Sequence, residues 1–148
     1  MKEVLLQSVV IVALSVVGGV ATKIWHPYAP VAKVSAGTLG EGEISVADAL
    51  RWSGEDKVVW IDARSRAEFE KAHAPGAFLL NEAEWNELLW DSGPELMEMS
   101  DKRYVVYCGN MDCHASIKIA EKLRERGFYE VLVLKGGWPA LEAALKSP

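Results

Sequence analysis

A cysteine stands between a buried strand and a helix in the second half of the chain. Residues 103–107 form an apolar run that is typical of a buried strand, and Cys108 follows it directly. A polar loop comes next, and then a helix that runs through Ile117 and Leu123 and is closed by Gly127. The first amides of a helix have no partner within it, and together with the helix dipole they favour an anion. The pattern therefore predicts a Cys108 thiol with a lowered pKa, which is a nucleophilic thiolate near neutral pH.

The backbone amides of the loop are the second part of this predicted site. They could converge on one point and hold a persulfide anion or an oxyanion donor such as thiosulfate. Gly109 allows the tight backbone that this requires. The expected cradle consists of Gly109, Asn110, Met111, Asp112, Cys113 and His114. The alternative is that Cys108 is a small buried hydrophobic residue, because a free cysteine is often just that.

Cys113 adds a redox hypothesis. Two cysteines with four residues between them in one loop could approach to disulfide distance. Cys113 could then attack a persulfide or sulfenate on Cys108 and close a bridge, while a plain role at the cap of the helix stays open. The spacing of Cys108, Cys113 and His114 fits no common zinc pattern, so we expect no metal and no cofactor.

The elements around this loop alternate between strands and helices. Apolar runs predict strands over residues 57–62, 77–80, 103–107 and 130–134. Helices are expected near 45–50, over 65–72, over 82–101 with a break at residues 92–94, after Cys108, and over 139–146. Single helices between strands indicate a parallel sheet with helices on both faces. Ligands of such sheets bind beyond the carboxyl ends of the strands, which is where Cys108 lies.

Four stretches in this order resemble the motifs of rhodanese-like domains. They are Asp62-Ala63-Arg64 with Glu68-Phe69, then residues 72–77 (Ala-His-Ala-Pro-Gly-Ala), then Tyr107-Cys108, and finally Gly127-Phe128 with Gly136-Gly137-Trp138. The resemblance covers about residues 43–145. It implies an α/β fold with a central parallel sheet of about five strands. It also implies a sulfurtransferase that moves sulfur through a persulfide on Cys108, from a small donor such as thiosulfate to a thiol or cyanide.

The loop departs from the family pattern at one position. Many members carry an arginine five positions after the cysteine, where this chain has Cys113. The departure favours a low-molecular-weight persulfide or a protein as sulfur donor. Arg64 is the best candidate to supply the missing positive charge, although Asp62 and Arg64 also suit an internal ion pair. His73 is a candidate acid or base, or a structural hydrogen-bonding residue.

Two further functions of the same fold remain open. A non-catalytic rhodanese module could position a partner, and a phosphatase could use the same loop. A phosphatase needs an arginine that binds the phosphate oxygens, and residues 109–116 contain no arginine.

The N-terminal part of the chain has the features of a membrane segment. Residues 4–22 carry no charge and would form a helix of about 28 Å, close to the thickness of a bilayer core. We expect a single-pass anchor over residues 1–24, a flexible linker over 25–42 and the rhodanese-like domain over 43–148. A cleaved signal peptide and a buried core helix are the alternatives. Lys2 lies on one side of the segment and Lys23 and Lys33 on the other, which favours a cytoplasmic domain by a margin of one charge. A periplasmic or extracellular domain is the alternative.

The charge balance bears on partners. The chain has 16 basic and 21 acidic residues and a net charge of −5, which argues against a nucleic-acid surface. Residues 82–101 contain acids and no base, which indicates either a solvated helix face or a docking site for a basic partner.

Overall fold

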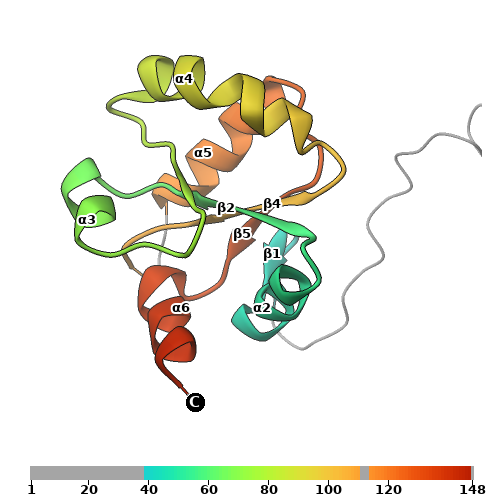
Figure 1. Cartoon of the computed structure of the whole chain (residues 1–148), viewed down its shortest axis with the longest axis vertical. Coiled ribbons are helices and arrows are strands. Elements are labelled where there is room, and N and C mark those ends of the chain that lie inside the picture. Colours follow the sequence, from blue (N-terminus) through green and yellow to red (C-terminus); the bar gives the residue numbers. More distant parts are fainter. Residues whose placement is uncertain (1–38, 111–113, 148) are drawn as a thin grey trace, which may run out of the picture. The chain divides into compact units, whose positions relative to one another are not determined.

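A five-stranded parallel sheet forms the centre of the folded part. The computed structural model describes residues 39–110 and 114–147. The strands are β1 (Glu43–Ile44), β2 (Val58–Asp62), β3 (Phe78–Leu79), β4 (Arg103–Tyr107) and β5 (Val131–Leu134). Their order in the sheet is β1-β5-β4-β2-β3, and each neighbouring pair is parallel (Figure 1). β4 is therefore the central strand, and the residue that follows it lies at the middle of the carboxyl edge.

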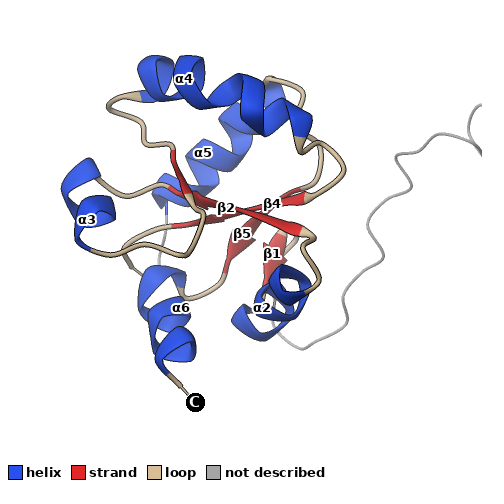
Figure 2. Cartoon of the chain, viewed as in Figure 1, coloured by secondary structure: helices blue, strands red, loops and turns tan. Residues whose placement is uncertain are grey.

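Helices cover both faces of this sheet (Figure 2). They are α2 (Val46–Gly54), α3 (Arg66–Lys71), α4 (Trp85–Glu98), α5 (His114–Glu125) and α6 (Gly137–Lys146). Apolar side chains of α4 and α5 join one buried cluster, and those of α2 and α6 join the other. The α/β class and the parallel sheet that the sequence predicts are thus confirmed.

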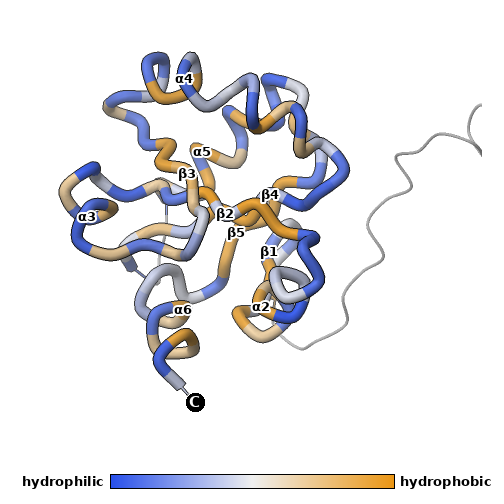
Figure 3. Tube along the Cα trace, viewed as in Figure 1, coloured by the Kyte–Doolittle hydropathy of each residue, from blue (hydrophilic) through white to orange (hydrophobic). Residues whose placement is uncertain are grey.

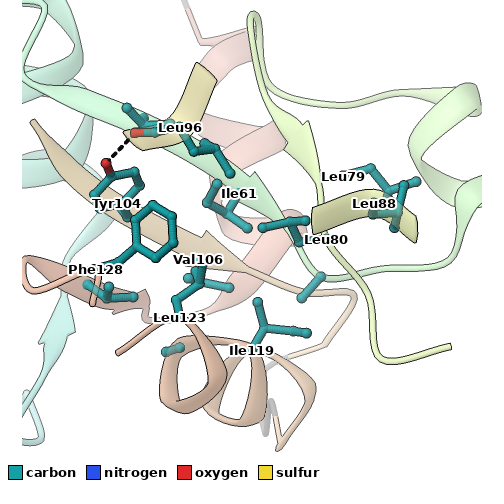
Figure 4. Close-up of a cluster of buried hydrophobic side chains, with 14 of the residues drawn as sticks. Ile61, Leu79, Leu80, Leu88, Leu96, Tyr104, Val106, Ile119, Leu123 and Phe128 are labelled. Atoms are coloured by element: carbon teal, nitrogen blue, oxygen red, sulfur yellow. Dashed lines mark hydrogen bonds between the residues drawn. The ribbon is translucent and has the colours of Figure 1, made fainter. Parts of the chain in front are cut away.

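The residues of β4 alternate between the two clusters, as the pleat of a strand requires. Tyr104 and Val106 belong to the cluster under α4 and α5, and Val105 and Tyr107 belong to the cluster under α2 and α6. Cys108 continues the first series. Figure 3 shows the hydrophobic colour concentrated along the strands, and Figure 4 shows the first cluster at close range. The alternation therefore directs Cys108 toward the side of the sheet that α5 covers.

Three helix ends have residues that commonly cap a helix. Ser45 caps α2, and Ser65 forms a reciprocal capping box with Glu68 at the start of α3. Gly127 has a φ of 91°, the left-handed conformation expected of a residue that ends α5. β1 was not predicted, because Ile44 is the only apolar residue between Gly42 and Ser45 and forms no apolar run.

The predicted membrane anchor over residues 1–24 lies outside the described residues, as does the linker up to residue 38. Among the residues that the structure does describe, no helix has the length and apolar character needed to cross a bilayer.

The predicted break in the helix at residues 92–94 is wrong. α4 runs without interruption from Trp85 to Glu98, with Pro94 inside it. A proline cannot donate the backbone hydrogen bond to the carbonyl four residues earlier, which is that of Trp90. Buried side chains on both sides of the proline, Leu88 and Leu96, hold the helix against the sheet. Tertiary packing therefore outweighs the local preference.

We expect Pro94→Ala to raise the free energy of unfolding by about 1–3 kcal/mol, because alanine restores the missing hydrogen bond and suits a helix interior. Chemical denaturation followed by tryptophan fluorescence measures the change. Pro139→Ala is the matched control, since Pro139 is the third residue of α6, where backbone amides lack helical partners in any case. Equal effects of the two substitutions would contradict the explanation.

Candidate functional site

Cys108 lies at the carboxyl end of the central strand, and its side chain is buried. The residue is 2% exposed and is counted with the apolar cluster under α4 and α5. Its Sγ lies 3.4 Å from the carbonyl oxygen of Asn110. Cys108 is also disulfide-bonded. A sulfur in a disulfide is not a thiolate, so the described state must be reduced before Cys108 can act as a nucleophile.

The structure describes only the two ends of the predicted cradle, which is the loop that follows Cys108. Gly109 and Asn110 are exposed, and His114 is the exposed first residue of α5. Met111, Asp112 and Cys113 lie outside the described residues. The arrangement of strand, cysteine, loop and helix is therefore as the sequence predicts, and the convergence of the loop amides stays a prediction.

The start of α6 holds the backbone of this loop. Trp138 N donates a hydrogen bond to the carbonyl oxygen of Cys108 at 2.6 Å. A Cβ atom on Gly137 would lie 2.6 Å from that oxygen and 2.8 Å from the carbonyl oxygen of Asn110. Only a glycine fits at this distance, so Gly137 fixes where the first residues of the loop run. In the sequence, Gly136-Gly137 is part of the stretch that resembles rhodanese-like domains, and the doubled glycine is the one signal of this close approach.

Asp62 and Arg64 form an internal ion pair next to the loop. Arg64 Nε donates to Asp62 Oδ1 at 2.9 Å, and Arg64 Nη2 donates to Asp62 Oδ2 at 2.6 Å. Arg64 Nη2 also donates to the carbonyl oxygen of Ala72 at 2.6 Å. Burial lowers the pKa of Arg64, but the hydrogen bonds and the charge of Asp62 outweigh it, and the net pKa is raised. The charge of Arg64 is therefore compensated within the protein.

Aromatic rings complete the surroundings of Arg64. Its guanidinium carbon lies 4.4 Å from the ring centroid of Trp138 and 5.6 Å from that of Tyr107. The Tyr107 hydroxyl accepts a hydrogen bond from Ala74 N at 3.1 Å, and burial raises the pKa of this hydroxyl. Such contacts stabilise a cation in a desolvated place and hold its side chain in one orientation. Arg64 thus connects β2, β4 and α6 around the base of the loop.

Glu68 brings a carboxylate close to the first residue of the loop, next to Arg64. A Cβ atom on Gly109 would lie 3.3 Å from Glu68 Oε1 and 3.7 Å from Arg64 Cδ. The hydrogen bonds that Ser65 donates to it lower the pKa of Glu68, so the group is ionised near neutral pH. The sequence places Glu68 in a stretch that resembles the family motif, but it does not predict the proximity of Glu68 to Gly109. Its negative charge is unfavourable for an anionic substrate at this point.

The contacts of His73 are with Phe69 in α3 and indicate a structural role. The residue is exposed, its Nδ1 lies 2.8 Å from the carbonyl oxygen of Phe69, and its ring stacks on that of Phe69 at a centroid distance of 4.0 Å. These contacts fix the end of α3. Within residues 39–110 and 114–147, no three histidine, cysteine or acidic side chains come together as a metal site.

One family model matches most of the folded part of the chain. A model of the rhodanese-like domain matches residues 45–144. A search of curated proteins finds no match. The solved structure of the BH2092 protein from Bacillus halodurans is 25% identical, with a TM-score of 0.59 over 70% of this chain and 72% of that one.

Two other similar structures carry functional names. A protein of unknown function from Rhodopseudomonas palustris, described as a possible tyrosine phosphatase, is 25% identical, with a TM-score of 0.56 over 76% of this chain and 96% of that one. Thiosulfate sulfurtransferase from Pseudomonas aeruginosa is 24% identical, with a TM-score of 0.55 over 69% of this chain and 18% of that one. At 24% identity, the similarity to the thiosulfate sulfurtransferase supports the fold of this chain and not its activity.

Proposed function

This chain belongs to the rhodanese-like domain family, and we propose that it is a sulfurtransferase that carries sulfane sulfur on Cys108. The observation that carries the proposal is the place of Cys108, directly after the central strand β4 and ahead of α5. This edge of a parallel sheet is where ligands bind, and a helix start nearby favours the thiolate and the persulfide anion.

The proposed reaction has two displacement steps on sulfur. The Cys108 thiolate attacks the outer sulfur of a donor, the sulfur–sulfur bond of the donor breaks, and the donor leaves as a thiolate or, for thiosulfate, as sulfite. An acceptor thiolate, or cyanide, then attacks the outer sulfur of the persulfide, and Cys108 leaves as a thiolate. No electrons are gained or lost overall, so no cofactor is required.

The charges beside the loop bear on the choice of donor. Arg64 is compensated by Asp62, and the Glu68 carboxylate lies against Gly109. The loop therefore offers little net positive charge to a dianion such as thiosulfate. We propose that a persulfide of a small thiol, or a protein persulfide, is the donor. The same lack of a gripping arginine argues against a phosphatase reaction.

A second candidate function is a thiol–disulfide redox reaction. The disulfide-bonded state of Cys108 favours it, and Cys113 is the other cysteine of the sequence. In this reaction the Cys113 thiolate attacks the inner sulfur of a Cys108 persulfide, a Cys108–Cys113 disulfide forms, and hydrosulfide leaves. A separate reductant, such as a dithiol protein, then has to regenerate the thiols.

We also propose that residues 1–24 anchor the protein in a membrane as a single-pass segment. The support is the uncharged run over residues 4–22. Which side of the membrane the domain occupies decides its redox environment, because an exported thiol needs a source of electrons to stay reduced.

The test is the intact mass of the full chain after reduction, removal of the reductant and incubation with glutathione persulfide. We expect a gain of one sulfur atom, about 32 Da, in the wild type and in Cys113→Ser, and no gain in Cys108→Ser. Thiosulfate should give a smaller yield. Without prior reduction, the wild type should gain nothing.

Two other results would replace the proposal. A loss of about 2 Da after incubation, which requires both cysteines and releases hydrosulfide, would establish the redox reaction instead. If the reduced chain gains no sulfur from either donor, the domain is a non-catalytic module.

A further inference from the structure

α4 presents an exposed apolar row on its outer surface. Trp90 is 84% exposed and Met97 is 53% exposed, and Pro94 between them is exposed as well. Spacings of four and three residues place these three side chains on one face of the helix. The inner face carries the buried Trp85, Leu88 and Leu96, so the outer row has no part in the core. We call Trp90, Pro94 and Met97 the apolar row.

A second row, of carboxylates, runs beside the first. Glu87, Asp91, Glu95 and Glu98 follow one another at spacings of four, four and three residues, which is again one line along the helix. All four are exposed. Two other acids of residues 82–101 have structural partners: Glu82 pairs with Lys118, and Glu84 pairs with Arg66. Within the described residues, Asp91, Glu95 and Glu98 are in no ion pair.

The acidic row is unfavourable for the helix itself. Like charges at a spacing of four residues repel each other. Glu95 and Glu98 also stand at the carboxyl end of α4, where the helix dipole favours positive charge, and the last turn has no basic residue. The stability of α4 therefore gives no reason for these charges.

The two rows together indicate the chemistry of a partner. We propose that the outer face of α4 is a docking surface for a basic amphipathic segment of another protein, whose apolar side chains cover Trp90 and Met97 and whose lysines or arginines pair with the acidic row. A large exposed tryptophan is the kind of side chain that contributes most to binding. The basic groups would relieve the repulsion within the row.

The negative charge of the acidic row argues against two other occupants of this surface, a second copy of the chain and a membrane. A second copy of the chain would bring one acidic row close to another, and an anionic membrane surface would repel the row as well. The proposal does not depend on the sulfurtransferase reaction, since none of these side chains belongs to the loop after Cys108.

The test measures binding of the full chain to a short synthetic helical peptide with lysines along one side and leucines along the other. Isothermal titration calorimetry at low and high salt gives the affinity. We expect saturable binding that weakens with salt, and roughly a tenfold or greater loss in Trp90→Ala with Met97→Ser. A peptide with glutamates in place of the lysines should not bind.

Matched variants separate this surface from the overall charge. The triple change Asp91→Lys, Glu95→Lys and Glu98→Lys should abolish binding. The control triple replaces the exposed Glu70, Glu121 and Glu125 by lysine, which changes the net charge equally, and should bind as the wild type does. Leu145→Ala, at an exposed residue of α6, is the apolar control.

Each remaining outcome would overturn the proposal. These outcomes are no binding of the basic peptide, equal losses in the α4 triple and the control triple, and retained affinity in the Trp90 and Met97 variant. Self-association that needs Trp90 would identify a second copy as the occupant. Binding to anionic vesicles that needs Trp90 would identify a lipid surface.

Discussion

Asp62→Asn is expected to lower the free energy of unfolding by roughly 3–5 kcal/mol, because it leaves a buried arginine without its counterion. Asp62 is fully buried and Arg64 is 7% exposed, and Nε and Nη2 of Arg64 donate three hydrogen bonds to the Asp62 carboxylate. Asparagine keeps the size and shape of the residue, so lost packing contributes little. Chemical denaturation of the full chain, followed by tryptophan fluorescence, measures the change.

Two controls test the reason for this loss. Glu142→Gln removes the exposed Lys146–Glu142 pair and should change the free energy of unfolding little, since solvent screens this pair. Adding Arg64→Met to Asp62→Asn should recover much of the lost stability, because the uncompensated charge is then gone. If Asp62→Asn costs no more than Glu142→Gln, Arg64 does not depend on this carboxylate.

The Asp62–Arg64 ion pair is one of the two roles that the sequence leaves open for Arg64. Cys113 stands where many rhodanese-like domains carry an arginine, and the other role is that Arg64 supplies this positive charge to the loop. The structure keeps Arg64 close to the loop, with its Cδ 3.7 Å from where a Cβ of Gly109 would be. Yet Asp62, two residues before Arg64, accepts the hydrogen bonds of the Arg64 guanidinium. Whether a charge is available depends on its partners, and these follow from the folded geometry.

The fold was largely predictable because its signals are local. Apolar runs between turns mark four of the five strands, and capping residues mark the helix starts at Ser45 and Ser65. β1 escaped detection because its two residues are held by pairing with β5 and not by a pattern of their own. The uninterrupted α4 was mispredicted because burial of Leu88 and Leu96, on both sides of Pro94, is a tertiary effect.

The site divides in the same way. Cys108 could be identified because the strand before it and the helix after it are readable from the sequence. The proximity of Glu68 to Gly109, and of Gly137 to the carbonyls of Cys108 and Asn110, joins residues that are distant in the sequence. Apart from the doubled glycine at residues 136–137, no residue type or spacing indicates these two contacts, and coordinates are needed to find them.

The contact at Gly137 leads to the second large expected effect. Gly137→Ala should lower the free energy of unfolding by roughly 2–5 kcal/mol, from an unfavourable backbone conformation and from overpacking. Gly137 has a φ of 56°, and an alanine Cβ would meet the Cys108 carbonyl oxygen at 2.6 Å. Both atoms are attached to backbone, so no side-chain rotation can relieve the clash. The loop or the start of α6 has to move.

Gly76→Ala is the matched control for this effect. Gly76 also has a positive φ, of 71°, but a Cβ there would have no atom within 4 Å. Gly76→Ala should therefore lower the free energy of unfolding only by the cost of the unfavourable backbone conformation, about 1–2 kcal/mol. The difference between the two variants isolates the clash with the loop, and denaturation curves measure it. If the proposed persulfide chemistry is correct, Gly137→Ala should also slow sulfur loading of Cys108 while Gly76→Ala leaves it unchanged. Equal stabilities of the two variants would show that the loop yields freely, and that the start of α6 does not position Cys108.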